Sequence, residues 1–120
     1  MQEFMLKAKL HRATITHAEL SYEGSLSIDQ ELMAAVGLRE FERIHIYNIN
    51  NGERFETYAI KAPGGSGTVG LNGAAARKGM VGDLIIIVSY CLVDAADLAN
   101  YRPQIALLGS NNRIKEMIAG

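Results

Sequence analysis

The feature that most limits the fold is the regular spacing of turn residues, which interrupt short β-rich runs about every 8–12 residues. The clearest hairpin joins residues 43–49 to residues 53–60 through Asn50-Asn51-Gly52, since Asn and Gly tolerate the positive φ that a two-residue turn requires. Apolar and polar side chains alternate over residues 6–16, which predicts a half-buried strand. Residues 84–93 are so apolar that we expect a strand buried on both faces. Six or so short strands favour a small closed barrel, mainly β with minor α.

A small helix is expected after Gly24-Ser25. Ser27 with Gln30 forms a capping box, Gly37 is a natural left-handed stop, and the apolar stripe between them consists of Leu32, Met33 and Val36. The remaining expected elements are a polar loop over residues 94–103, a short strand near residues 105–108 and a frayed helix over residues 112–118. The chain of 120 residues shows neither a linker nor a repeat, so we expect a single domain, residues 1–120.

Composition argues against several classes of protein. Lys and Arg number 12 against 13 Asp and Glu, a formal charge of −1 that leaves no basic surface for duplex nucleic acid. The longest aliphatic run, residues 84–88, is far shorter than a membrane span, and residues 1–10 lack the apolar core of a signal peptide. The single cysteine, Cys91, cannot form an intrachain disulfide, which fits a reducing compartment. We therefore expect a soluble, cytoplasmic protein that binds neither nucleic acid nor membrane.

Three familiar kinds of site are not indicated. The three histidines, His11, His17 and His45, lack the i, i+4 spacing of a helical zinc site and have no thiolate partner, so no metal is predicted. The glycine-rich residues 64–73 lack the Lys and Ser or Thr of a phosphate loop and the long helix of a dinucleotide site, which favours a hairpin or barrel corner. No Gly-x-Ser-x-Gly surrounds Ser25, which argues against a Ser–His–acid triad.

The segment Glu23-Gly24-Ser25 admits two interpretations. A Gly-Ser pair is typical of an ordinary turn. However, Gly24 can adopt backbone geometries forbidden to other residues, and a strained peptide before a serine would let Ser25 Oγ attack the preceding carbonyl. Spacing alone does not decide between the two.

A set of short motifs, read together, resembles the aspartate 1-decarboxylase family. The part similar to the family's self-cleaving segment comprises Lys9-Leu10-His11-Arg12, Thr16-His17-Ala18, Leu20 and Tyr22-Glu23-Gly24-Ser25. The motifs that follow are Ile28-Asp29-Gln30, Asn51-Gly52, Arg54-Phe55, Thr57-Tyr58-Ala59-Ile60, Asn72-Gly73-Ala74-Ala75-Ala76, Val81-Gly82-Asp83 and Tyr101-Arg102-Pro103. They span residues 9–103 in the family's order and spacing, so the resemblance covers nearly the whole chain.

The resemblance implies a fold and an activity. The fold is a six-stranded double-psi β-barrel with short helices, assembled as a homotetramer. Because side chains fill the interior of a barrel of this size, we also expect the sites to be shared between subunits. The activity is conversion of L-aspartate to β-alanine and CO₂ for pantothenate and coenzyme A synthesis. Self-cleavage between Gly24 and Ser25 gives a β chain of residues 1–24 and an α chain of residues 25–120. The cofactor is a covalent pyruvoyl group made from Ser25, which forms a Schiff base with the substrate; neither metal nor pyridoxal phosphate is used.

The resemblance also implies roles for individual residues. Ser25 becomes the pyruvoyl group, Tyr58 is the proton donor, and Arg54 and Lys9 hold the substrate carboxylates. The further positions of the pocket are Thr57 and the backbone of Gly73, Ala74 and Ala75; Asn72 and Tyr22 match it less closely. Arg54 precedes Tyr58 by four residues, so on one strand they share a face about 13 Å apart, and a bend or a neighbouring subunit must bring them together. Position 47 is Tyr where some members carry Trp, which keeps an aromatic wall.

Two other interpretations stay open. The chain could be a non-catalytic small β-barrel that binds a ligand or protein, with Gly24-Ser25 as an ordinary turn. It could also be a family member that never self-processes, because cleaved and uncleaved chains have the same encoded sequence. The need for a partner protein that assists maturation is likewise left open.

Overall fold

The structure, a computed structural model, describes residues 1–21 and 23–118 and is mainly β. The strands in the described residues are β1 (Gln2–Thr14), β2 (His17–Glu19), β3 (Ser25–Asp29), β4 (Arg43–Asn48), β5 (Arg54–Ala62), β6 (Val69–Asn72), β7 (Leu84–Asp94), β8 (Gln104–Leu108) and β9 (Ile114–Ile118). The helices are α1 (Gln30–Val36) and the 3₁₀ turns η1 (Gly73–Lys78), η2 (Ala95–Asn100) and η3 (Ser110–Asn112). Across this described part, no helix has the length and apolarity that crossing a membrane would need.

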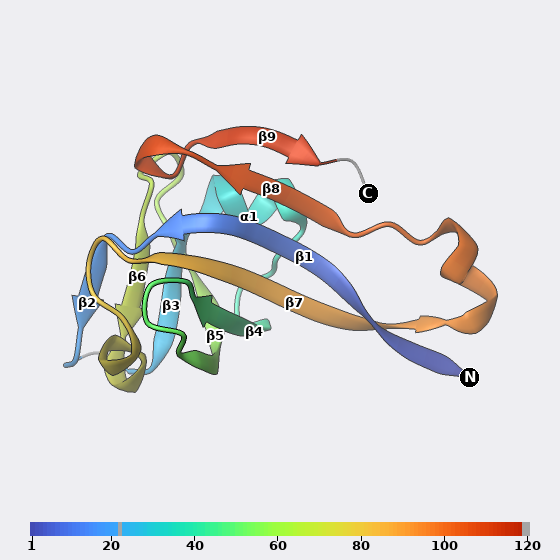
Figure 1. Ribbon diagram of the computed structural model, residues 1–120, viewed down its shortest axis with the longest axis horizontal. Helices are drawn as coiled ribbons and strands as arrows, with labels where there is room; N and C mark the ends of the chain where they lie inside the picture. The colour runs from blue at the N-terminus through green and yellow to red at the C-terminus, as the bar shows by residue number, and fades with distance from the viewer. Residues whose placement is uncertain (22, 119–120) are drawn as a thin grey trace.

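The strands pair in the order β2-β6-β3-β5-β4-β7-β1-β8-β9 (Figure 1). Three of the pairs are parallel, β2 with β6, β3 with β5 and β1 with β8, and the others are antiparallel. Because β3 lies between β5 and β6, the connection from β5 to β6 crosses over β3. The mainly β class is thus confirmed, whereas a closed six-stranded double-psi barrel stays a prediction.

One face of the sheet, together with α1, encloses the hydrophobic core. The alternation predicted for the first strand is confirmed, since Ala8 and Leu10 are fully buried while Lys9 and His11, which follow each of them, are half-exposed. On β3 the same alternation buries Leu26 and Ile28. The other face of β3, which carries Ser25 and Ser27, is therefore turned away from the core.

The predicted hairpin forms, with a longer loop than expected. β4 and β5 pair in the register Tyr47 opposite Arg54. The backbone bonds are Asn48 N–H to Glu53 O, 2.9 Å, and Gly52 N–H to Asn48 O, 3.0 Å, so the loop spans four residues and not two. Gly52 adopts φ 77°. The longer loop is stabilised by Asn48 Oδ1, which accepts from the backbone N–H groups of both residues that follow Ile49, at 2.8 and 3.2 Å.

The predicted helix also forms, but its N-cap was predicted wrongly. Ser27 lies inside β3, which stays paired with β5 as far as Asp29. The cap is therefore Asp29, whose carboxylate accepts from Glu31 N–H at 2.8 Å. The helix ends at Gly37 with φ 75°, as predicted.

The helix predicted over residues 112–118 is wrong. Asn111 and Asn112 turn the chain back with φ values of 58° and 55°, and β9 then pairs antiparallel with β8. Pairing covers the edge of β8, which would otherwise leave a row of backbone groups without partners. β9 itself is exposed along its whole length.

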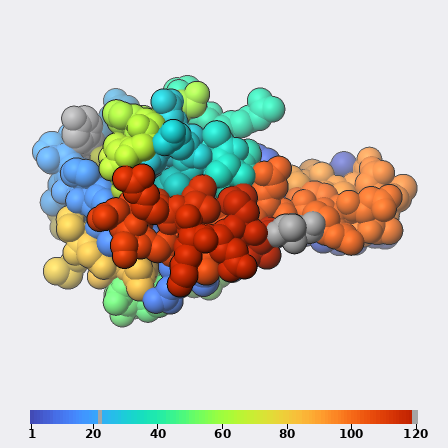
Figure 2. Space-filling model, turned by 90° about the horizontal axis from the view of Figure 1, so that it is seen from above, coloured from blue at the N-terminus to red at the C-terminus, as the bar shows by residue number. Residues whose placement is uncertain are grey.

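The predicted burial of residues 84–93 holds for the first half of β7 only. Beyond Ser89 the strand continues with β1 into a projecting arm, where Tyr90 and Leu92 are exposed. Figure 2 shows this arm extending from the body of the protein, with η2 at its end, and the overall extents are 45 × 27 × 25 Å.

Candidate functional site

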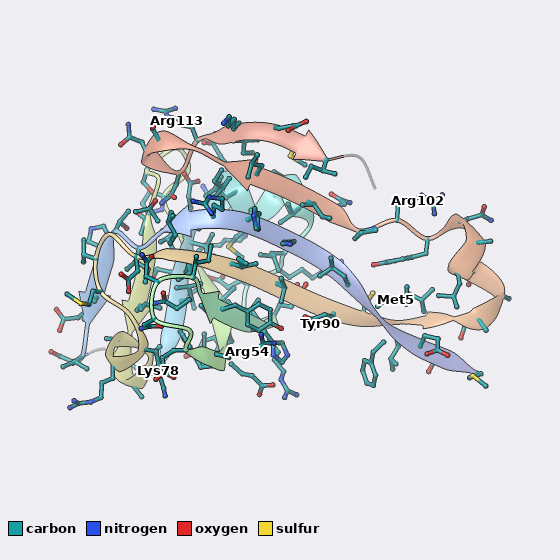
Figure 3. The ribbon with its side chains drawn as sticks, in the orientation of Figure 1. Met5, Arg54, Lys78, Tyr90, Arg102 and Arg113 are labelled. Carbon is teal, nitrogen blue, oxygen red and sulfur yellow. The ribbon has the colours of Figure 1, made fainter. Side chains whose placement is uncertain are left out.

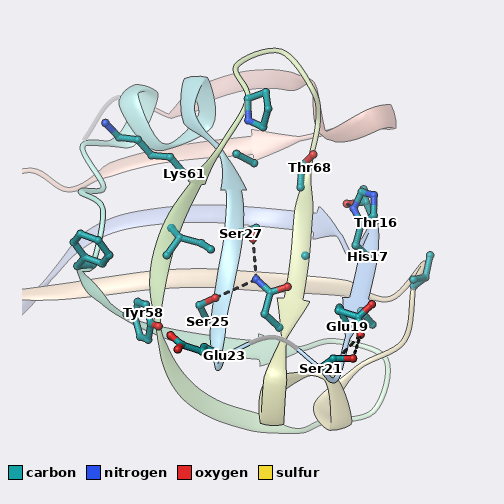
Figure 4. Close-up of a pocket in the computed structure, with 18 residues that line it drawn as sticks. Thr16, His17, Glu19, Ser21, Glu23, Ser25, Ser27, Tyr58, Lys61 and Thr68 are labelled. Atoms are coloured by element: carbon teal, nitrogen blue, oxygen red, sulfur yellow. Dashed lines mark hydrogen bonds between the residues drawn. The ribbon is translucent and has the colours of Figure 1, made fainter.

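A groove of about 1140 Å³ lies over the outer face of β2, β6, β3 and β5 (Figure 4). Strand register explains why polar side chains reach it. Ser25 pairs with Asn72 and Ser27 with Gly70 on β6, whereas Leu26 between them faces the core. The residues that line the groove are Thr16, His17, Ala18, Glu19, Ser21, Glu23, Ser25, Ser27, Phe41, Tyr58, Ile60, Lys61, Ala62, Pro63, Thr68, Gly70, Asn72 and Val81.

Ser25 lies at the base of this groove and its hydroxyl is held in place. The residue is 3% exposed, and Asn72, which is 8% exposed, donates from Nδ2 to Ser25 Oγ at 3.0 Å. The same amide nitrogen donates to Ser27 Oγ at 2.8 Å, so both of its hydrogens are engaged. The proton of Ser25 must then point elsewhere, while its oxygen is fixed relative to β6.

Gly24, just before Ser25, has no conformation that only glycine could adopt. Its φ is outside the left-handed region, and a Cβ built on it would meet no described atom within 4 Å. The sequence argument that Gly24 supplies a special backbone geometry is therefore not supported by the structure.

Tyr58 shares the groove with Ser25. β3 and β5 run parallel with Leu26 beside Ala59, so positions 25 and 58 stand next to each other on the outer face. Tyr58 is half-buried, and its ring lies 6.4 Å from that of Phe41, tilted by 42°. The groove thus combines an oriented serine hydroxyl, an amide donor and a phenol.

The opposite wall of the groove is polar, and sequence reasoning gave it no role. Thr16 Oγ1 accepts from Val69 N–H at 2.9 Å and lies 2.7 Å from His17 Nδ1. Gly70 has no side chain, which leaves the floor open between Ser27 and His17. Pairing of β2 with β6 creates this wall, and nothing local in the sequence predicts that pairing.

Charged groups of both signs border the site. The pKa of Glu19 is lowered because its carboxylate accepts from the hydroxyl and backbone N–H of Ser21, at 2.7 and 3.1 Å. Glu23 and Lys61 also line the groove. Within residues 1–21 and 23–118, no group of three or more His, Cys, Asp or Glu side chains is placed to hold a metal ion.

Six of the predicted positions, Lys9 among them, lie outside the groove of a single chain. Thr57 is opposite Ile44 and faces the core, and the backbone of Gly73, Ala74 and Ala75 belongs to η1, directly after Asn72. The fifth, Arg54, is at the far end of β5, where its guanidinium carbon lies 4.0 Å from the centre of the Tyr47 ring.

The other predicted cation, Lys9, is also outside the groove. It lies on β1, and β7 and β4 separate that strand from β5. Its neighbour His11 has a lowered pKa, first because of burial and then because Lys9 and Arg12 are cations. Tyr22 lies outside the described residues.

Comparison with known proteins gives one consistent result. Residues 1–115 match the family described as Aspartate decarboxylase. Aspartate 1-decarboxylase of Desulfotalea psychrophila is 59% identical over 114 residues, which cover 95% of this chain and 96% of that protein. The Ralstonia nicotianae protein of the same name is 57% identical over 119 residues, 99% of both chains. That of Methylococcus capsulatus is 58% identical over 114 residues, 95% of this chain and 90% of that protein.

Proposed function

This chain belongs to the aspartate decarboxylase family, and we propose that it works through a pyruvoyl group formed from its own Ser25. The reaction of the enzyme is release of CO₂ from L-aspartate, which leaves β-alanine for pantothenate synthesis. The observation that carries the proposal is the bond from Asn72 to Ser25 Oγ at the base of a groove that also contains Tyr58.

The residues present fit a pyruvoyl group at position 25. Ser25 is almost inaccessible to solvent, yet it lines the base of the groove. A pyruvoyl group made from Ser25 itself would therefore be in place without having to enter from solution. Asn72 would hold it, since an amide that donates to a hydroxyl oxygen can also donate to a ketone oxygen. When bound, the group supplies an electron sink for the charge left on the substrate carbon as CO₂ departs.

Self-cleavage would make this group from the chain alone. Ser25 Oγ attacks the carbonyl carbon of Gly24, the Gly24–Ser25 amide bond breaks, and an ester links the two residues. Loss of the Ser25 Cα proton then expels the Gly24 carboxylate and leaves dehydroalanine, whose hydrolysis releases ammonia. The buried position and the Asn72 bond favour attack, because they restrict the hydroxyl to one orientation.

Tyr58 would return the proton after decarboxylation. Its phenol stands beside position 25 on the neighbouring strand, which is where the substrate carbon must lie. A phenol O–H can donate a proton to a carbon atom held within hydrogen-bond reach.

We propose that a second copy of the chain completes the groove, within a homotetramer. Four strand spacings, about 19 Å, separate the strand of Lys9 from that of Ser25, and Arg54 is about 13 Å along β5 from Tyr58. The groove also exceeds the roughly 300–1,000 Å³ of clefts that bury drug-sized ligands, so a four-carbon amino acid would fill only part of it. Lys9 and Arg54 of a neighbouring copy would supply the missing carboxylate ligands.

Intact mass and a decarboxylation assay test the proposal. Purified protein should yield fragments of 24 and 96 residues, the larger one lighter by one ammonia than a chain that starts with Ser25. Ser25→Ala should stay as one band and release no CO₂. Ser27→Ala is the matched control, because it also loses a bond to Asn72 but keeps the nucleophile, and it should still cleave. Wild-type protein that is active without being cleaved would overturn the mechanism. Wild-type protein that is neither cleaved nor active would favour a binding module or an unprocessed family member.

The shared site has its own test. Subunits with Ser25→Ala and subunits with Arg54→Ala are inactive alone for different reasons, so a mixed oligomer should recover part of the activity. Hetero-oligomers that stay inactive, although the Arg54→Ala chains self-process, would assign each site to one chain. The expected cytoplasmic location and a partner protein that assists maturation remain predictions.

A further inference from the structure

An aromatic and ionic cluster lies on the outer face of the sheet, away from the groove. It consists of His45 and Tyr47 on β4, Arg54 on β5 and Tyr90 on β7. The guanidinium carbon of Arg54 lies 4.0 Å from the centre of the Tyr47 ring. The hydroxyls of Tyr47 and Tyr90 are 2.8 Å apart, and the ring of His45 stands at 78° to that of Tyr90 with centres 5.2 Å apart. Figure 3 shows Arg54 and Tyr90 on the same side of the molecule.

We propose that Tyr90 is a positioning residue for Arg54, and that it acts by bonding Tyr47, the ring against which the guanidinium packs. The proposal rests on the proposed function, in which Arg54 binds a carboxylate of the substrate. It deepens that function by saying what holds the cation ready, since Tyr90 itself does not touch the substrate.

The charges around Arg54 leave its donors free. The carboxylate that it could pair with, Glu56, is engaged by Arg43 at 2.8 Å and approached by His45 Nε2 at 3.4 Å. Among the described residues, the Arg54 guanidinium makes no ion pair or side-chain hydrogen bond, and the Tyr47 ring is its packing partner. Packing on a ring face uses none of the five guanidinium N–H groups, so the fork stays available for a dicarboxylate.

The ring can hold the guanidinium only if the ring itself is held. Tyr47 is half-buried and Tyr90 is 42% exposed, so packing alone leaves both rings freedom to move. The bond between their hydroxyls joins two side chains that start on adjacent strands, β4 and β7. Tyr47 also raises the pKa of Tyr90, so the hydroxyl stays protonated and the bond persists at neutral pH.

The test compares three Tyr→Phe variants in processed enzyme. Tyr90→Phe and Tyr47→Phe break the same bond and keep both rings, so each should raise KM for L-aspartate about three- to tenfold with kcat within about twofold. The double variant should be no worse than either single variant, because one bond is lost in all three. Tyr101→Phe is the matched control, because its hydroxyl donates to Leu6 O at 2.6 Å and lies 3.4 Å from Cys91 Sγ. This variant also removes one tyrosine hydroxyl near β7 but leaves the bond between Tyr47 and Tyr90 intact, so KM should not change.

A second measurement does not depend on turnover. Succinate, a dicarboxylate without the amino group, is titrated by calorimetry into each variant, and its Kd should rise in parallel with KM. A Tyr90→Phe chain with unchanged KM and Kd, alongside an Arg54→Ala chain that binds weakly, would overturn the positioning role. Unchanged succinate binding in Arg54→Ala would overturn it too, because Arg54 would then not be the group that binds the carboxylate. Failure of the proposed reaction gives a different result: wild type would still bind succinate through Arg54, with the Kd dependent on Tyr90, but would release no CO₂ from L-aspartate.

Discussion

Replacement of Asp29 by Asn tests how the wall of the groove is held. The carboxylate is 3% exposed and accepts three backbone N–H groups, from Glu31 at 2.8 Å, Gly65 at 3.1 Å and Gly67 at 2.9 Å. The two glycines belong to the loop between β5 and β6 that leads to Thr68 at the groove. Asp29 thus ties the end of β3, the start of α1 and this loop together.

The magnitude follows from those bonds. The amide nitrogen of Asn cannot accept a hydrogen bond, so in Asp29→Asn an NH₂ group would replace one carboxylate oxygen and would face a backbone N–H donor. The hydrogen bonds to the remaining oxygen would no longer be strengthened by a negative charge. Loss of one charge-assisted bond together with a buried donor left unpaired costs about 2–4 kcal/mol in the free energy of unfolding. For a chain of this size, that lowers Tm by roughly 6–20 °C.

Calorimetry at a fixed protein concentration, as a function of pH, provides the assay. Burial raises the pKa of Asp29, but the backbone N–H groups of Gly67, Glu31 and Gly65, with a smaller effect from the nearby N–H of Leu32, together lower it below its ordinary value. A lowered folded-state pKa means that the stabilisation is complete above the unfolded value of about 3.9 and is lost as pH falls through the folded value. The gap in Tm between wild type and Asp29→Asn should therefore be constant near neutrality and shrink below about pH 4.

An exposed acid gives the control. Asp97 lies on η2 at the end of the arm, and Asp97→Asn should change Tm by no more than about 2 °C. The reasoning is refuted if Asp29→Asn is no less stable than Asp97→Asn, or if its deficit is as large at pH 3 as at pH 7.

Two further predictions concern the proton donor and the loop. Tyr58→Phe keeps the ring that packs against Phe41 but removes the phenol, so the chain should still self-cleave while β-alanine formation falls about 100-fold or more; near-normal turnover would leave Tyr58 a packing residue only. Gly67→Ala should lower stability by about 1–3 kcal/mol, because φ is 69° and the new Cβ would lie 2.7 Å from the carbonyl oxygen of Asn111. Gly64→Ala is its control for thermal unfolding, since the Cβ there meets only flexible side-chain atoms, and equal losses in the two variants would contradict the argument.

Much of the candidate site could be named from the sequence, but not its arrangement. Ser25, Asn72 and Tyr58 were predicted through a resemblance carried by short motifs, and the structure places all three in one groove. The resemblance predicts that Arg54 and Lys9 act with them, yet in one chain neither borders the groove. The order of motifs along the chain does not say which strands become neighbours in the sheet. The order of strands in the sheet is what separates Lys9 from the groove.

Features of the fold that depend on neighbours in the chain were determined by the sequence itself. Alternation over β1 and the stop at Gly37 follow from backbone chemistry within a few residues, and the structure reproduces both. Where a distant partner competes, local reasoning failed. Pairing of β3 with β5 moved the helix cap from Ser27 to Asp29, and the open edge of β8 made a strand of residues predicted to be helical. Only the tertiary structure could decide these points, because a backbone hydrogen bond to a strand remote in sequence outweighs the weak preference of a few residues for helix.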